Sequence, residues 1–320
     1  MVVFGPGAAA ALIEGSKSFA KDVMRAAGVP TADVLESPRA PCVVKVDGLA
    51  AGKGVFVCAT QAELDTALAS AETFDGPTVI EELLEGEEVS LFALADGSLA
   101  IPLAPAQDFK RARDGDEGPN TGGMGAYSPV GHPGAADVEG LLDTVHRPVL
   151  AELARRGTPF VGLLYAGLML TDAGPRVLEF NARFGDPETQ AILPRVEGDL
   201  LGALWAAANG DLAGVELQVA DRAAVTVVLT AADYPARGDV GTPIEGVEAA
   251  EETGAIVFHA GTALKDGRLV TNGGRILNVT GVAPTVEEAR ELAYGACDLI
   301  SFAGMRYRSD IAARRAIGVG

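Results

Sequence analysis

The sequence contains little cysteine and little histidine, and both shortages narrow its chemistry. Its 320 residues include three cysteines, which are far apart and form no CxxC or Cys/His cluster. This spacing argues against a zinc site and against a disulfide framework, and it favours a reducing compartment, so we expect a cytoplasmic protein. The three histidines are also scattered, and they fit no Ser-His-Asp or Cys-His arrangement.

Positive charge and long apolar runs are scarce as well. The chain carries 25 Lys and Arg against 44 Asp and Glu, a formal net charge of -19. Such an acidic protein is a poor binder of nucleic acid, although a local cationic pocket for a small anion is compatible with it. The uncharged, apolar run at residues 157–171 is too short to cross a bilayer. We therefore expect neither a nucleic-acid partner nor a membrane.

Apolar residues and glycine are plentiful, at 48% of the chain and 40 residues respectively. A substantial core and many tight turns follow from these numbers. Expected strands and helices are mixed, with hairpin-like spacings between strands, which favours an α+β fold over regular βαβ units. From about Arg222 the pattern changes to that of a smaller α+β domain.

The stretch V-L-E-F-N-A-R-F-G-D-P-E, residues 177–188, is the most informative. In an extended strand, Glu179, Asn181 and Arg183 share one face and apolar residues share the other. Carboxylate and amide oxygens suit Mg²⁺, and a guanidinium suits a phosphate or carboxylate. Alternation alone predicts a solvated polar face equally well.

A Gly-rich segment, D-G-L-A-A-G-K-G at 47–54, separates two expected strands at 41–46 and 55–58. It differs from a P-loop in spacing, and no Ser or Thr follows Lys53. Backbone N–H groups of such a hairpin can still cover phosphates, and Lys45 can reach the same anion. An ordinary turn with a solvated lysine explains the pattern equally well.

The stretch V-I-E-E-L-L-E-G-E-E-V, residues 79–89, reads as a strand, a linker and a second strand. Backbone groups from Glu82 to Leu84 can meet the edge of an adenine ring, and Glu88 can accept hydrogen bonds from ribose hydroxyls. Taken alone, the stretch is better explained as a charged surface turn.

Residues 105–134 show no periodicity, and we expect them to form a long loop. The loop gathers Lys110, Arg111 and Arg113 in an acidic chain, and N-T-G-G-M-G at 120–125 offers a run of backbone N–H donors. Long ordered loops usually carry function, so a functional role is favoured.

Taken together and in this order, these motifs resemble one known family. They are Lys45 with D-G-L-A-A-G-K-G, E-E-L-L-E-G-E-E, G-P-N-T-G-G-M-G-A-Y-S-P, Y-A-G-L-M and E-F-N-A-R-F-G-D-P-E-T-Q. H-A-G-T and T-N-G-G-R follow near residues 259–275. The chain resembles the phosphoribosylamine–glycine ligases, ATP-grasp enzymes of purine biosynthesis, over essentially its whole length.

The resemblance implies an α+β ATP-grasp fold whose two subdomains clamp ATP, followed by a small C-terminal domain. It places the main subdomain at 1–40 and 87–220, the lid subdomain at 41–86 and the C-terminal domain at 221–320. The implied reaction joins glycine to 5-phosphoribosylamine through a glycyl phosphate, with ATP and Mg²⁺ or Mn²⁺. Two alternatives remain: another ATP-grasp carboxylate–amine ligase, and a non-catalytic or partner-dependent ATP-binding fragment.

The resemblance also assigns roles to individual residues. ATP binding is expected of Lys17, Lys45, Gly52, Lys53, Gly54, Glu82, Leu84 and Glu88. Metal binding is expected of Glu179 and Asn181, and a place at the reacting centre of Arg183 and Asp186. Substrate contacts are expected of Asn120, Gly122, Gly123 and Arg275, the last with the sugar phosphate.

One feature departs from the family. Its members begin with a further N-terminal α/β domain of order a hundred residues, whose Gly-rich opening is absent from this sequence. That domain is expected to form part of the phosphoribosylamine site. A separate chain that supplies it is therefore a candidate partner, and ATP binding is expected to be less affected than ligation.

Overall fold

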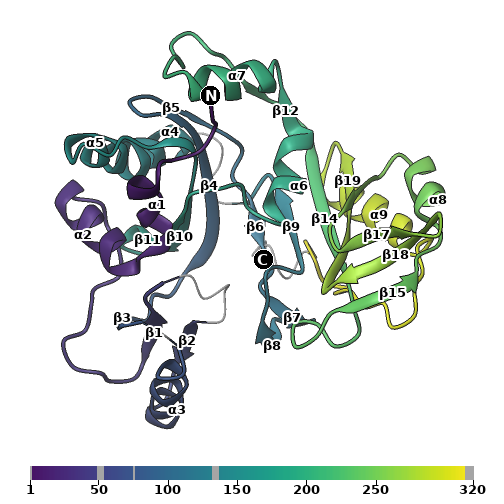
Figure 1. Ribbon diagram of the computed structural model, residues 1–320, viewed down its shortest axis with the longest axis horizontal. Helices are drawn as coiled ribbons and strands as arrows, with labels where there is room; N and C mark the ends of the chain where they lie inside the picture. Colours follow the sequence, from purple (N-terminus) through teal and green to yellow (C-terminus); the bar gives the residue numbers. More distant parts are fainter. Residues whose placement is uncertain (1, 49–53, 75, 132–136, 314–320) are drawn as a thin grey trace. The chain divides into compact units, whose positions relative to one another are not determined.

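The computed structural model describes residues 2–48, 54–74, 76–131 and 137–313 and has the expected α+β composition (Figure 1). The chain forms two compact units. The first contains Met1–Leu103, Ala136–Phe184 and Gly198–Leu217, and the second contains Ala104–Ala135, Gly185–Glu197 and Gln218–Gly320. The three-part domain division given above stays a prediction.

The main sheet of the first unit is antiparallel, in the order β11-β10-β4-β5. Its strands are β4 (Glu87–Asp96), β5 (Ala100–Pro102), β10 (Val161–Thr171) and β11 (Gly174–Asn181). The accompanying helices are α1 (Ala8–Gly15), α2 (Lys17–Ala27), α4 (Val138–Leu141), a π-helical turn (Leu142–His146), α5 (Arg147–Arg155) and α7 (Leu200–Ala208). Residues from α1, α2, α4 and α5 form a single apolar core with one face of this sheet.

Helix α2 begins and ends at residues that carry local capping signals. The Ser16 hydroxyl accepts a hydrogen bond from the Phe19 backbone N–H, which caps the first turn. Gly28 ends the helix in the left-handed conformation, at φ 70°, which glycine adopts without steric cost. These two residues fix where the helix starts and stops, and therefore which α2 side chains face the sheet.

A smaller antiparallel sheet, in the order β2-β1-β3, belongs to the same unit. It consists of β1 (Cys42–Val46), β2 (Val55–Cys58) and β3 (Thr78–Glu82), and α3 (Gln61–Ala71) covers one face. Helix α3 starts at a reciprocal capping box between Thr60 and Glu63. The predicted hairpin between β1 and β2 is confirmed, whereas residues 49–53 of its Gly-rich turn lie outside the described residues.

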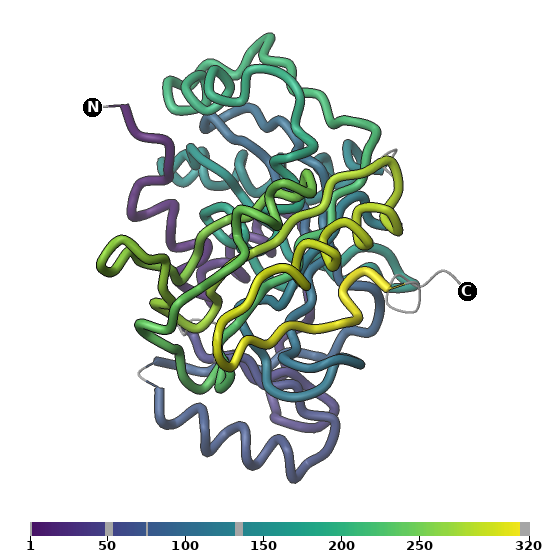
Figure 2. The backbone as a smooth tube through the Cα atoms, turned by 90° about the vertical axis from the view of Figure 1, so that its right-hand side faces the viewer, coloured from purple at the N-terminus to yellow at the C-terminus, as the bar shows by residue number. Residues whose placement is uncertain are grey.

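The second unit has a five-stranded antiparallel sheet in the order β16-β19-β14-β9-β6. These strands are β6 (Gln107–Asp108), β9 (Gly125–Ser128), β14 (Ala223–Thr230), β16 (Ile256–His259) and β19 (Arg275–Ala283). Helix α9 (Val286–Cys297) packs on one face, in front of the sheet in Figure 2, and α6 (Glu188–Ile192) contacts β9 and β14. Val225 and Val227 share the core with α9, while the preceding residue Ala224 packs with Ala191 of α6, so the two helices lie on opposite faces.

Shorter elements complete the second unit. They are β7 (Arg111–Arg113), β8 (Glu117–Asn120), a 3-10 turn (Leu193–Arg195), β12 (Val196–Glu197), β13 (Gln218–Val219), β15 (Asp239–Pro243), α8 (Val247–Glu252), β17 (Thr262–Lys265) and β18 (Arg268–Gly273). Strands β17 and β18 are joined by Asp266 and Gly267, both at positive φ, as a two-residue hairpin turn requires.

The prediction of a long loop over 105–134 is wrong in part. This segment contains β6, β7, β8 and β9, and β9 is fully buried between β6 and β14. Strand β14 lies about a hundred residues further along the chain, so the pairing is non-local and leaves no periodic pattern within the segment itself.

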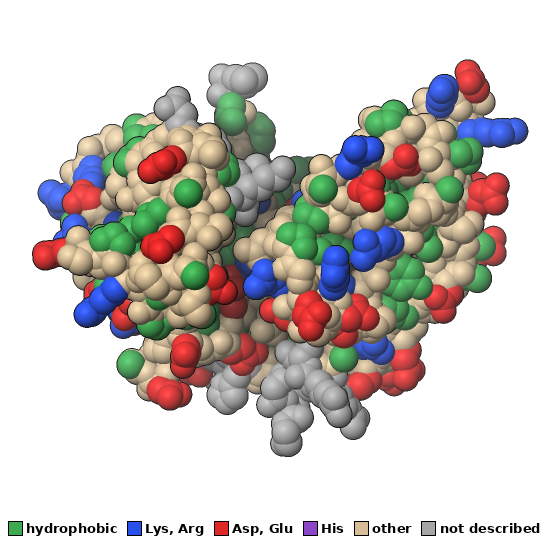
Figure 3. Space-filling view, turned by 90° about the horizontal axis from the view of Figure 1, so that it is seen from below, with side chains coloured by type: hydrophobic (Ala, Val, Ile, Leu, Met, Phe, Trp, Pro, Cys, Tyr) green, Lys and Arg blue, Asp and Glu red, His purple; other side chains and the backbone are tan. Residues whose placement is uncertain are grey.

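The surface carries charges of both signs. Figure 3 shows acidic and basic side chains interspersed on the visible faces of both units. Among the described residues, no helix is long and apolar enough to cross a membrane.

Candidate functional site

One face of the main sheet of the first unit is apolar. The opposite face buries Phe92, Leu94 and Leu163 toward one end and carries polar side chains toward the other, and this polar face gathers several predicted site residues. Glu179 on β11 pairs with Gly167 on β10, which pairs with Ser90 on β4. One row along, Asn181 pairs with Tyr165. Residues directly opposite one another in a sheet point to the same side, so these side chains share a face.

Glu88 belongs to the same face, because it lies two residues before Ser90 on β4. The Ser90 and Tyr165 hydroxyls hydrogen-bond to each other at 2.8 Å and stiffen this face. Gly167 has no side chain, and a Cβ placed there would lie 3.7 Å from the Cγ of Glu179. The Glu179 side chain therefore has a neighbour without a side chain on β10.

Strand β11 deviates from strict alternation at Leu178. Gly167 pairs with Glu179 and the next residue, Leu168, pairs with Val177, so Leu178 has no partner in the ladder. This is a β-bulge. Our prediction that Leu178 faces the core beside Phe180 is wrong for this reason, since the core residues are Val177 and Phe180. The Leu178 carbonyl instead accepts a hydrogen bond from Lys45 Nζ at 2.9 Å.

Lys45 lies on the face of the small sheet that is opposite to α3. It is buried and forms an ion pair with Glu81, with Nζ 2.8 Å from Oε2. Lys21 of α2 is buried too, and its Nζ lies 3.0 Å from the other oxygen of Glu81. Burial lowers the pKa of Lys21, while the attraction of Glu81 opposes this effect. Lys21 carried no sequence signal that marked it for function, and Glu81 belongs to the quoted motif E-E-L-L-E-G-E-E but was given no role.

Glu82 and Leu84 are half-buried at and just after the end of β3. The Glu82 carboxylate accepts from Arg176 at 2.7 Å and from the Asp33 backbone N–H at 2.9 Å. The backbone N–H of Glu82 donates to the Asp33 carbonyl. The Glu82 carboxylate thus already has partners within the unit.

Lys17, the first residue of α2, contacts one end of the Gly-rich turn at residues 47–54, and Gly54 forms the other end. Lys17 Nζ lies 3.4 Å from the Gly48 carbonyl oxygen, and the Gly54 carbonyl accepts from the Val46 N–H. Gly52 and Lys53, the other two predicted ATP ligands of this turn, lie outside the described residues.

Asp47 joins this turn to the start of α2. Burial alone would raise the pKa of Asp47, but hydrogen bonds from Ser18, Lys17 and Ser16 outweigh it and hold the pKa below its usual value. An ionised carboxylate at a helix N-terminus is also favoured by the helix dipole. The sequence analysis did not single out Asp47.

Arg183 follows β11, and α1 holds it in place. Its Nε donates to Glu14 at 3.1 Å, and one terminal nitrogen lies 3.3 Å from the amide oxygen of Asn181. Glu14 also accepts from the Ala182 N–H. The structure therefore brings Arg183 and Asn181 together, through an acidic residue that the sequence analysis did not identify.

The predicted substrate residues belong to the second unit. Arg275 donates to the Gly122 carbonyl at 2.6 Å and to the Asp186 carbonyl at 2.8 Å, and its other terminal nitrogen lies 3.1 Å from an Asp186 carboxylate oxygen. Gly123, at φ 109°, lies so close to Pro187 that a Cβ there would be 2.3 Å from the proline Cδ. Asn120 ends β8 opposite Arg111 and forms none of these contacts.

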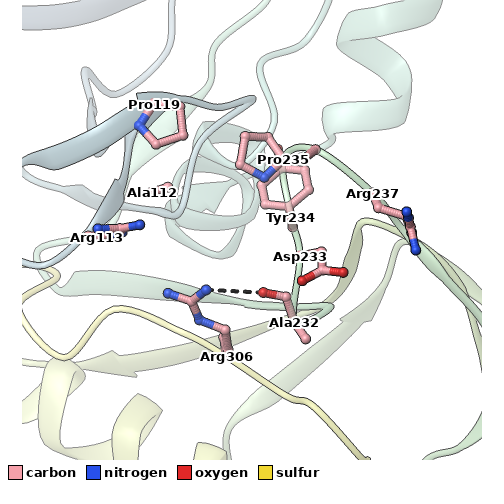
Figure 4. Close-up of a pocket in the computed structure, with 10 residues that line it drawn as sticks. Ala112, Arg113, Pro119, Ala232, Asp233, Tyr234, Pro235, Arg237 and Arg306 are labelled. Atoms are coloured by element: carbon pink, nitrogen blue, oxygen red, sulfur yellow. Dashed lines mark hydrogen bonds between the residues drawn. The ribbon is translucent and has the colours of Figure 1, made fainter.

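Tyr234 connects this cluster to a pocket of about 350 Å³. Its hydroxyl accepts a hydrogen bond from the Gly122 N–H at 2.9 Å, and its ring lines the pocket (Figure 4). Arg113 and Arg306 also line the pocket, and Arg306 donates to the Ala232 carbonyl at 3.0 Å. Tyr234 was missed from the sequence because its partner is about a hundred residues away.

Two family models match the chain. Residues 15–189 match the phosphoribosylglycinamide synthetase ATP-grasp (A) domain, and residues 224–314 match the C domain of the same synthetase. The phosphoribosylamine–glycine ligase of Streptomyces coelicolor is 51% identical, over 98% of this chain and 78% of the relative.

Solved structures agree with these matches. The phosphoribosylamine–glycine ligase of Thermotoga maritima is 37% identical and superposes with a TM-score of 0.85, covering 97% of this chain and 81% of its own. The biotin carboxylase domain of Hydrogenobacter thermophilus 2-oxoglutarate carboxylase, 18% identical, has a TM-score of 0.69 over 96% of this chain and 70% of its own. At that identity it shows the fold alone, and the expected ATP-grasp fold is confirmed.

Proposed function

Because the chain belongs to the phosphoribosylamine–glycine ligase family, we propose that it joins glycine to 5-phosphoribosylamine and converts ATP to ADP and phosphate. The observation that carries the proposal is the polar face of the main sheet, where Glu88, Glu179 and Asn181 lie together within an ATP-grasp domain. A cytoplasmic location fits the three free, buried cysteines.

Glu179 and Asn181 suit a divalent cation, Mg²⁺ or Mn²⁺. They offer a carboxylate and an amide oxygen two residues apart on one face of a strand, with a glycine opposite. A bound cation of this kind supplies positive charge that offsets the charge on transferring phosphate. Lys45 and Lys17 are proposed to add cationic hydrogen-bond donors to the ATP phosphates, Glu82 and Leu84 to meet adenine, and Glu88 to meet ribose.

The proposed reaction requires little covalent catalysis by the protein. A glycine carboxylate oxygen attacks the γ-phosphorus of ATP, ADP leaves, and a glycyl phosphate results. The amine of 5-phosphoribosylamine then attacks the acyl carbon, phosphate leaves, and the nitrogen loses a proton. Both steps concentrate negative charge, so fixed cations such as Arg183 lower the barrier electrostatically. We propose that Asp186 acts at the reacting centre, and that Arg275 orients the sugar phosphate substrate together with Asn120, Gly122 and Gly123.

The direct test measures ADP release by the full chain with ATP, glycine and 5-phosphoribosylamine, each omitted in turn. We expect release to require all three and to yield glycinamide ribonucleotide by mass spectrometry. A parallel arm adds a candidate chain that supplies the family's N-terminal domain. The proposal would be contradicted if ADP release did not depend on glycine, or if the enzyme joined glycine to a different acceptor.

Glu179→Gln tests the metal assignment. We expect turnover to fall at least about a hundredfold, because the amide lacks the charge that holds the cation beside the phosphates. Asp172→Asn, in the exposed turn at the other end of the β10–β11 hairpin, is the matched control and should retain full activity. Undiminished ADP release by Glu179→Gln would rule out its role as a ligand.

A further inference from the structure

Lys21, Glu81 and Lys45 form a buried triad in which one carboxylate serves two ammonium groups. The Lys and Glu side chains are 7% or less exposed. The two Nζ atoms contact different oxygens of Glu81, at 3.0 Å for Lys21 and 2.8 Å for Lys45. Within residues 2–48, 54–74, 76–131 and 137–313, no second carboxylate lies within ion-pair distance of either ammonium.

The two lysines differ in how many of their N–H donors have partners. Lys21 Nζ donates to Glu81, to the Thr31 hydroxyl at 2.8 Å and to the Ala32 carbonyl at 2.7 Å, which uses all three hydrogens of an ammonium group. Lys45 Nζ has two partners among the described residues, Glu81 and the Leu178 carbonyl. One donor of Lys45 is therefore left for another acceptor.

Among the described residues, the neighbouring carboxylates pair with other cations, so the triad keeps its excess of one positive charge. Arg176 is the next cation, and it is the cation that Glu82 neutralises, at 2.7 Å. The Asp33 carboxylate, whose side chain is 83% exposed, lies 3.9 Å from the same Arg176 nitrogen. Arg176 therefore has carboxylate partners of its own, and within the buried triad two cations face one carboxylate. A buried charge without a counter-charge costs free energy, and a site that keeps one is electrostatically incomplete until an anion arrives.

We propose that Lys21 is a positioning residue that neutralises Glu81, so that Lys45 keeps a surplus positive charge and a free N–H for the phosphates of the nucleotide. This inference rests on the proposed binding of ATP by the first unit. It makes nucleotide affinity depend on the net charge of the triad: one positive charge in the native protein, none without Lys21, two without the Glu81 charge.

The experiment measures the dissociation constant of MgADP by calorimetry for the full chain and three variants. Lys21→Met should weaken binding at least tenfold and raise the KM for ATP in proportion, with kcat at saturating ATP within about threefold of native. Glu81→Gln should bind at least as tightly as native. The double variant Lys21→Met/Glu81→Gln restores a net charge of one and should return to within about threefold of native.

A purely structural role for Lys21 predicts the opposite for the double variant, because removal of both partners disrupts the triad further. Lys265→Met, on an exposed strand end of the second unit, is the control and should bind as native. Double-variant binding as weak as that of Lys21→Met overturns the inference, even where Glu81→Gln alone does not fold. Native protein that binds no MgADP overturns the proposed function as well, whereas native binding with unchanged Lys21→Met affinity overturns this inference alone.

Discussion

Arg275 acts, at the scale of a single residue, as a planar clamp between two chain segments. Its two terminal nitrogens contact oxygens of Gly122 and Asp186. The guanidinium presents its N–H groups in a rigid fork, which a lysine ammonium cannot reproduce. Its donors toward these oxygens are already in use, which favours an orienting role over that of a simple phosphate ligand.

Arg275→Lys should therefore lower kcat/KM for 5-phosphoribosylamine by about 10- to 100-fold and leave the KM for ATP unchanged. Hydrogen bonds to charged groups contribute about 1.5–3 kcal/mol, and about 1.4 kcal/mol corresponds to a tenfold change. Arg268→Lys, exposed at the start of β18, is the matched control. Steady-state kinetics with each substrate varied separately give the answer, and an equal rise in the KM for ATP would contradict the clamp.

Residue types and spacing raised Glu179 and Asn181 as candidates, because the two-residue period of a strand is a local property. A solvated face explained that period equally well, and the family resemblance was needed to favour these two residues and Glu88. Lys21 and Tyr234 escaped notice for the converse reason. Their partners, Glu81 and Gly122, are 60 and 112 residues away, and no local pattern reports a contact over that distance. The roles of the nominated residues stay predictions.

At the scale of elements, the polar face of the main sheet depends on β10 having a glycine at its centre. Gly167 separates Ser90 from Glu179 along one row of the sheet. A Cβ there makes an ordinary contact of 3.7 Å with Glu179, whereas a branched side chain fills the space beside the carboxylate.

Gly167→Ala should therefore keep MgADP affinity within a few-fold of native, and Gly167→Val should weaken it by more than about tenfold at a similar melting temperature, since steric exclusion from the ligand face is the cause. Calorimetry and thermal unfolding of the two variants provide the comparison. Equal affinities would show that the space beside Glu179 is not used.

The elements that a sequence can predict are those with local signals at their ends. Helix α2 has a serine cap and a glycine terminator, and α9 begins at Thr285 with a capping box to Glu288. Strand β9 has no such signal, because its burial comes from β14 and β6 on either side. The bulge at Leu178 was missed because a strict two-residue period leaves no place for an extra residue.

At the scale of the whole molecule, His146 links folding stability to pH. It is fully buried on the π-helical turn, with Nε2 3.1 Å from the Leu164 carbonyl oxygen. Burial lowers the pKa of His146 from 6.5 to about 4, although hydrogen bonds to the backbone oppose this. Below pH 6.5, His146 binds a proton in the unfolded chain but stays neutral in the folded chain until the pH nears 4. The free energy of unfolding therefore falls as the pH falls from 6.5 toward 4.

His146→Gln should reduce this loss by about 2 kcal/mol between pH 7 and pH 5, as the linkage relation gives for these two pKa values. Urea unfolding followed by circular dichroism at both pH values measures it. His259→Gln, exposed at the end of β16, is the control and should show the native pH dependence. An unchanged dependence in His146→Gln would exclude His146 as its source.

The extra residue at Leu178 has an evolutionary consequence. Without it, Val177 and Glu179 would be adjacent and would pair in regular order with Leu168 and Gly167, so the sheet itself does not need Leu178. A single inserted codon in an ordinary strand is enough to expose a carbonyl group for Lys45. That one event would tie the small sheet to the main sheet while Glu179 and Asn181 keep the face they already had.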